Sequence, residues 1–155
     1  MTAGASEHSQ PLPSPAGLDA DWYAHCARGE LRFQRCGACG RWRHPPRLLC
    51  AGCGSEAWEW ARATGRGEVF SWTVTHQPLH PAFAPALPYV IVVIEMEEGV
   101  RVVAGVRGIE RVDLDLGLPV EVEIDRVSET VGLLYARPST VPGGGSTSAG
   151  PGRAK

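Results

Sequence analysis

"LRFQRCGACGRWRHPPRLLCAGCGSEAWEW", residues 31–60, holds two C-x2-C pairs separated by ten residues. The second cysteine of each pair is followed by glycine, which supplies the positive φ that a tight turn around a metal thiolate needs. Four thiolates complete the tetrahedral coordination of zinc and leave no position for water or substrate. The spacing therefore predicts one structural zinc ion, although iron also accepts four sulfurs. The predicted ligands are Cys36, Cys39, Cys50 and Cys53.

Other uses of four thiols fit this stretch less well. A disulfide framework is typical of secreted proteins. A thioredoxin-type redox centre uses one C-x-x-C in a βαβ setting, whereas this chain has two pairs among predicted strands. A catalytic zinc site would include a histidine or carboxylate and an open position.

The length of 155 residues allows one ordinary domain, or a small module joined to a larger one. Residues 1–17 and 139–155 are rich in Gly, Ser, Pro and Thr and are predicted to be disordered. We expect a helix and metal module over 18–64 and a second domain over 65–138. The sequence shows neither a signal-peptide pattern nor an apolar run near the ~18 residues of a membrane span. We therefore expect a cytoplasmic protein with no membrane partner.

Residues 19–28 predict a short helix before the cysteines. Asp19 or Asp21 is a candidate N-cap, and Gly29 stands where a left-handed residue ends many helices. The fifth cysteine, Cys26, falls on this helix, and we interpret it as a small buried hydrophobe.

Five short strands follow, with no amphipathic helix among them, and this pattern predicts a mostly β chain ending in a small five-stranded barrel. In the first strand, Phe70, Trp72 and Val74 are expected to share one face, because alternate residues of a strand point the same way. The predicted strands are 67–76, 89–96, 100–107, 120–127 and 132–138.

The first two barrel strands are joined by residues 76–88, which contain four prolines. Proline restricts its own φ and the residue before it, so this loop is long but stiff. Such loops often contact ligands or partners. Our candidates for that contact are His76, His80, Phe83 and the adjacent Tyr89.

Several motifs together resemble the DUF35 family, in which a rubredoxin-like zinc ribbon is joined to an OB-fold. The resemblance covers about residues 20–138 and is more specific than any single motif. The matching pieces are Leu31–Gly40, Pro45–Gly54, Gly65–Val74, His80–Phe83, Pro88–Val90 and Gly117–Val122.

This resemblance implies a non-catalytic accessory subunit, with the four cysteines as metal ligands. Family members associate with thiolase-like enzymes that act on acyl-CoA, including thiolases, aldolases and acyltransferases, and some pair with MaoC-like hydratases. The expected partner is therefore a thiolase-like or aldolase subunit in a hetero-oligomer, with acyl-CoA as ligand and a role in lipid or steroid metabolism.

Charge is unevenly distributed along the chain. Residues 28–66 contain eight Arg and three Glu, whereas residues 67–138 contain five Arg and eleven acidic residues. Arginine suits bidentate contact with phosphate oxygens such as those of CoA. The candidate phosphate contacts are Arg35, Arg41, Arg43 and Arg47. Trp42 lies between two of them, and we expect it to pack on its own module rather than stack on a base.

Two other functions stay open from the sequence. Zinc ribbons and OB-folds also bind nucleic acids, but a single-strand binder combines a basic groove with stacking aromatics, and the barrel segment is acidic. An independent acyl-CoA hydratase or transferase would need acid–base chemistry from His76 or His80, and no nucleophile motif accompanies them. We rank the accessory subunit first and the nucleic-acid module second.

Overall fold

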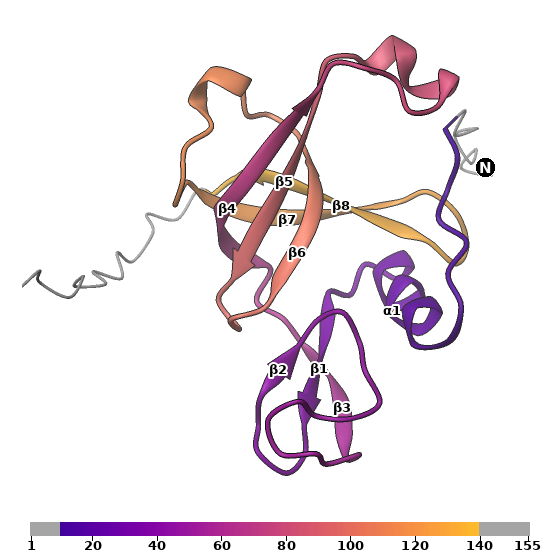
Figure 1. The fold of residues 1–155 in the computed structure, drawn as a ribbon, viewed down its shortest axis with the longest axis vertical. Helices are drawn as coiled ribbons and strands as arrows, with labels where there is room; N and C mark the ends of the chain where they lie inside the picture. Colours follow the sequence, from indigo (N-terminus) through magenta and orange to yellow (C-terminus); the bar gives the residue numbers. More distant parts are fainter. Residues whose placement is uncertain (1–9, 140–155) are drawn as a thin grey trace, which may run out of the picture.

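The computed structural model describes residues 10–139, which form one α-helix, two short 3-10 helices (labelled η), a three-stranded sheet and a β-barrel (Figure 1). The remaining residues, 1–9 and 140–155, lie outside the described part, and most of both predicted tails falls there. The elements are α1 (Gly17–Ala27), β1 (Arg32–Cys36), β2 (Trp42–Arg43), β3 (Trp58–Arg62), β4 (Arg66–Thr75), η1 (Pro81–Ala86), β5 (Tyr89–Met96), β6 (Arg101–Val106), η2 (Arg111–Asp113), β7 (Pro119–Arg126) and β8 (Gly132–Pro138).

The cysteine module is built on the antiparallel sheet β2-β1-β3, with β1 at its centre. Gln34 pairs with Arg43 on one side of β1 and with Trp60 on the other. Phe33 and Gln34 are fully buried. The first cysteine pair lies at the end of β1, so the strand fixes the position of Cys36 directly.

The remaining five strands close into a barrel in the order β4-β5-β6-β8-β7. β6 and β8 pair in parallel at residues 105 and 106, and all other neighbours are antiparallel. The barrel closes where Gly67 of β4 meets Val120 of β7. This topology confirms the predicted five-stranded barrel and the mostly β fold class.

Helix α1 lies against the barrel beside the start of β8 (Figure 1). The buried side chains of Trp22 and Cys26 join the same apolar cluster as Val92 and Val120 of the barrel. A Cβ on Gly132 would lie 2.5 Å from the carbonyl carbon of Cys26. Glycine at this position therefore lets the helix backbone touch β8, and one core unites helix, sheet and barrel.

The ends of α1 agree only in part with the sequence. Gly29 has φ +76°, as predicted for the residue that ends the helix. The predicted aspartate cap is wrong, because the helix begins after Ala16, whose position makes no side-chain cap hydrogen bond. Asp19 instead lies in the first turn, where the positive end of the helix dipole still stabilises a carboxylate. None of the described helices is long and apolar enough to cross a bilayer.

The predicted common face of β4 is wrong at Phe70. A β-bulge interrupts the register between Val69 and Ser71, so Phe70 is an extra residue opposite β5. Trp72 pairs with Val92 on the core-facing side of β5, whereas Phe70 contacts Arg101 on the outer face of the barrel. An inserted residue reverses the alternation that the sequence pattern assumes.

Candidate functional site

The four predicted cysteine ligands come together at the tip of the cysteine module. Their sulfur atoms all lie within 4.8 Å of one another. The Cys36–Cys53 and Cys39–Cys50 sulfur pairs are each 3.6 Å apart. Metal–sulfur bonds of about 2.3 Å at tetrahedral angles separate sulfurs by about 3.8 Å, so the cluster fits a four-sulfur metal site. Gly40 and Gly54, which follow the pairs, have φ of +72° and +74°.

Backbone amides prepare two of these thiols to ionise. The N–H groups of Gly52 and Cys53 lower the pKa of Cys50 to about 6, and those of Cys39 and Ala38 lower the pKa of Cys36. The Ser55 amide favours the thiolate of Cys53, but the neighbouring sulfurs of Cys39 and Cys36 raise the pKa of that thiol to about 11. A bound cation removes this repulsion between thiolates.

Cys26 is outside this cluster. It is fully buried on α1, and burial raises the pKa of its thiol to about 12. A thiol in this state is a poor nucleophile and metal ligand.

The four candidate phosphate contacts differ in their surroundings. Arg43 is turned into the module, where its Nε donates to Gln34 Oε1 at 2.6 Å and its Nη2 donates to the Arg47 carbonyl. Arg35 lies over the Trp42 ring at 5.7 Å, and Trp42 packs against the core as expected. The guanidinium of Arg41 lies beside Gly52. Arg35, Arg41 and Arg47 are exposed, and within residues 10–139 none of them forms an ion pair.

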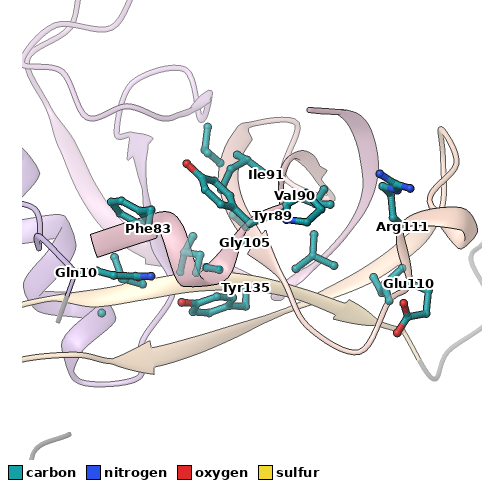
Figure 2. Close-up of a pocket in the computed structure, with 18 of the residues that line it drawn as sticks. Gln10, Phe83, Tyr89, Val90, Ile91, Gly105, Glu110, Arg111 and Tyr135 are labelled. Carbon is teal, nitrogen blue, oxygen red and sulfur yellow. The ribbon is translucent and has the colours of Figure 1, made fainter. Parts of the chain in front are cut away.

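A pocket of about 690 Å³ lies between the outer face of the barrel, the loop 76–88 and α1. In Figure 2, Phe83 and Gln10 lie at one end of this pocket and Glu110 and Arg111 at the other, with Tyr89 and Tyr135 between them. Its walls are mainly apolar, as is usual for small-molecule sites. The apolar wall residues include Phe83, Val90, Ile91, Val103, Val106, Ile109 and Leu134.

Tyr135 is packed between two neighbours on the pocket wall. Gly105 lies opposite it on β6, and a Cβ there would come within 2.7 Å of the tyrosine ring. The Arg107 guanidinium lies 3.6 Å from the ring centroid and donates to Glu123 and Asp125. Burial opposes the charge of Arg107, but these carboxylates raise its pKa above the ordinary value. The ring is therefore contacted from two sides.

The loop residues divide between the pocket and the surface. Phe83 and Tyr89 line the pocket, with ring centroids 5.9 Å apart. His80 precedes η1, and its Nδ1 accepts a hydrogen bond from the Ala82 amide at 3.2 Å. His76 is exposed and is not among the pocket-lining residues. The structure therefore brings two of the four loop candidates into the pocket.

The sequence did not predict that α1 and β8 contribute to this pocket. Trp22 lines it, and its buried Nε1–H has no acceptor among the described residues. Tyr135 also lines it, opposite a glycine in the apolar strand β6. A glycine inside a strand often marks a close approach, and this was the available signal.

Family comparisons match both parts of this architecture. The rubredoxin-like zinc ribbon domain of ChsH2 matches residues 24–59, and the C-terminal OB-fold domain of ChsH2 matches residues 60–125. A DUF35 domain-containing scaffold protein of Methanocaldococcus jannaschii is 32% identical over 96 residues, which are 61% of this chain and 67% of that protein. The chain belongs to the DUF35 family.

Two further similarities concern larger assemblies. A probable enoyl-CoA hydratase alpha subunit of Thermomonospora curvata is 40% identical over 111 residues, 72% of this chain but 34% of that subunit. The chain thus spans about a third of the length of this relative. A solved structure described as an Ltp2-ChsH2(DUF35) aldolase contains a chain that is 36% identical, with a TM-score of 0.74, covering 82% of this DUF35 protein and 98% of the other chain.

Proposed function

We propose that this DUF35 protein is a non-catalytic accessory subunit that binds an acyl-CoA-processing enzyme and helps to form its acyl-CoA channel. The expected partner is a thiolase-fold aldolase, thiolase or acyltransferase, with which a MaoC-like hydratase can also assemble. One observation carries the proposal: the chain aligns with 98% of the DUF35 chain of an aldolase assembly, at 36% identity. The hydratase alpha subunit name among its relatives points to the same acyl-CoA chemistry.

The metal serves structure in this proposal. Zinc is the expected ion, because the four cysteines supply only sulfur ligands in tetrahedral spacing and would leave no coordination site open. We also keep the division into 18–64 and 65–138 as proposed domains, and the cytoplasm as the proposed compartment, where a reducing environment preserves thiolate ligands.

The acyl-CoA contact would involve two regions. The apolar pocket beside Tyr89 and Tyr135 suits the acyl or pantetheine part, since tyrosine hydroxyls add polar contacts to apolar walls. The exposed guanidiniums of Arg35, Arg41 and Arg47 suit the phosphates. Arg43 contributes by holding the Arg47 carbonyl, which makes it a positioning residue.

The proposal is tested by co-expressing the chain with the thiolase-fold acyl-CoA aldolase subunit of the same organism. We expect a stable hetero-oligomer on size-exclusion chromatography and a change in the aldolase activity or solubility. The purified chain alone should show no hydratase or transferase turnover. Solo turnover that disappears in His80→Ala would overturn the assignment in favour of an enzyme.

A pocket variant tests the acyl-CoA contact separately. Gly105→Ala places a Cβ against the Tyr135 ring and should displace it, because β6 and β8 fix both backbones. We expect the complex to form normally while its KM for acyl-CoA rises several-fold. An unchanged KM would exclude the pocket from the channel without affecting the subunit assignment.

A further inference from the structure

The outer edge of β4 loses its backbone partner after Val69. Up to Glu68, β4 pairs with β7. Val69 then donates to the Leu118 carbonyl at 2.9 Å and accepts from the Gly117 amide at 2.8 Å. From residue 70 to residue 75 the strand pairs with β5 alone, and its other edge has no backbone partner in the described chain. Figure 1 shows β4 and β5 running together beyond the barrel toward η1.

The ladder pattern shows which groups are unpaired on this edge. In antiparallel pairs, alternate residues direct both N–H and C=O away from the partner strand. Val69 directs its backbone N–H and C=O away from β5. After the bulge, the residues with this same backbone orientation are Trp72 and Val74, which pair with Val92 and Val90. The N–H and C=O groups of Trp72 and Val74 therefore point outward.

The exposed edge lacks the features that normally prevent strand pairing. Its sequence, FSWTVT from residue 70 to 75, contains no charge, proline or lysine. Natural proteins usually protect free edges with such residues. Phe70 and Trp72 are also 42% and 36% exposed. An uncharged edge with exposed aromatics is suited to accept an added strand.

The sheet face next to this edge carries an exposed apolar side chain beside the Arg101–Glu95 ion pair. Val103 of β6 is 64% exposed and lies in register with Val93, which in turn pairs with Ser71. Arg101 lies 3.5 Å from the Phe70 ring centroid and fixes the ring on this outer face. The free edge and the exposed face form one continuous surface.

We propose that the edge of β4 from Phe70 to Thr75 accepts an extended, uncharged segment of the partner enzyme, whose body covers the outer face around Phe70 and Val103. The inference rests on the proposed function for the identity of that partner. Main-chain hydrogen bonds to Trp72 and Val74 would hold the added strand, and Phe70 and Val103 would supply apolar contact.

A second copy of this chain fits the surface less well. Pairing two β4 edges extends the sheet sideways and leaves both outer faces uncovered, including Phe70 and Val103. A ladder through only two residues with outward-facing backbone groups is short and buries little surface. A stable interface, by contrast, buries roughly 1,200–2,000 Å². A partner that covers edge and face together satisfies both requirements.

Val74→Pro tests the edge, with Val74→Thr as the matched control. Proline removes an N–H that points away from β5, so the ladder between β4 and β5 stays intact, and proline is tolerated on strand edges. We expect Val74→Pro to weaken binding to the co-expressed aldolase subunit by about ten-fold or more, at unchanged melting temperature. Val74→Thr keeps the amide and should bind like the wild type.

The face is tested by Val103→Glu, with Val112→Glu as its control, and because Val103 also lines the pocket, binding to the aldolase subunit is measured without acyl-CoA. Both valines are exposed, at 64% and 85%, but Val112 lies on η2. A buried unpaired charge is costly, so Val103→Glu alone should weaken the complex.

The outcomes separate the two proposals. If the wild type binds the aldolase subunit and Val74→Pro binds equally well, the edge assignment is overturned and the accessory function stands. If the wild type does not bind, both the accessory function and the edge assignment are overturned. If the purified chain dimerises in analytical ultracentrifugation and Val74→Pro abolishes the dimer, the occupant is a second copy, and the partner assignment is overturned.

Discussion

Gln34 organises the cysteine module from inside the central strand β1. Its side chain is fully buried, and its Oε1 accepts from Arg43 Nε at 2.6 Å and from the Arg47 amide at 2.7 Å. These two contacts attach the segment between the cysteine pairs to the sheet. The strand residue thus determines where Arg47 is presented.

Gln34→Leu should therefore destabilise the protein without removing a metal ligand. The change keeps the apolar volume but leaves Arg43 Nε and the Arg47 amide without their acceptor, at a cost of about 1–3 kcal/mol each. Thermal unfolding should show a clearly lower melting temperature with unchanged metal content. Gln77→Leu, at an exposed loop position, is the control and should change little.

His44 gives the module a pH dependence that can be measured. Its ring lies against Trp22 and Phe33, with centroids 4.7 and 5.3 Å away, and burial lowers its pKa from 6.5 to about 4. The unfolded chain binds this proton more tightly, so stability falls as pH drops from 6.5 toward 4. The full loss would be about 3 kcal/mol.

Replacing the imidazole isolates this effect from metal release, which also increases in acid because thiolates are protonated. Denaturant unfolding of wild type and His44→Gln should be compared between pH 6.5 and 5. We expect a smaller decrease in stability for the variant over that interval. Equal slopes would mean that the half-buried imidazole does not titrate with the unfolding transition.

At the residue scale, the sequence predicts chemistry that depends on spacing and misses contacts that depend on packing. The cluster of four cysteines follows from two C-x2-C pairs, because a metal site requires both a residue type and a separation. The bond from Gln34 to Arg43 crosses between strands whose register the sequence does not specify. The grouping of Arg43 with the exposed arginines overlooked this internal role for the same reason.

Among the elements, α1 depends on a close backbone contact with β8. A Cβ at residue 132 would lie 2.6 Å from the Cys26 oxygen and 2.9 Å from the Ala27 nitrogen, and backbone atoms cannot rotate away. Gly132→Ala should therefore push α1 from the barrel and destabilise the fold by about 1–3 kcal/mol, as other overpacked sites do.

The measurement is chemical denaturation combined with hydrogen exchange in α1. Gly37→Ala is a suitable comparison, because its Cβ would make an ordinary 3.4 Å contact with the Ala57 side chain. A stable Gly132→Ala variant with unchanged protection in α1 would show that the helix can shift at no cost.

The strands were the most predictable elements, and β4 shows where that predictability ends. The alternation of apolar and polar residues, together with turn glycines, predicts the ends of every barrel strand to within one or two residues. A half-buried strand must show this alternation, because its two faces meet different surroundings. The bulge at Phe70 leaves no trace in the pattern, because an extra residue changes pairing rather than composition. The pocket was equally hidden, since it combines α1, η1, β5, β6 and β8.

For the whole molecule, the metal site and the barrel contribute unequal shares of the core. The buried apolar residues of the barrel include Val69, Val92, Ile94, Val102 and Val120, whereas the sheet around the cysteines buries mainly Phe33. We therefore expect the cysteine module to depend on a bound metal, which contributes an apparent ~10–16 kcal/mol in comparable sites.

Removing the metal should unfold one part of the molecule and leave the other. After chelation, amides of β1 and β3 should exchange rapidly, because little apolar area remains to hold them. β5 and β6 should stay protected, since their partner strands and their core do not include the four clustered cysteines. Cys53→Ser should reproduce the effect, whereas Cys26→Ala, which alters the buried thiol outside the cluster, should keep the metal. Protection of β1 that survives complete chelation would show that packing alone stabilises the module. The four thiols would then have a role other than structural metal binding.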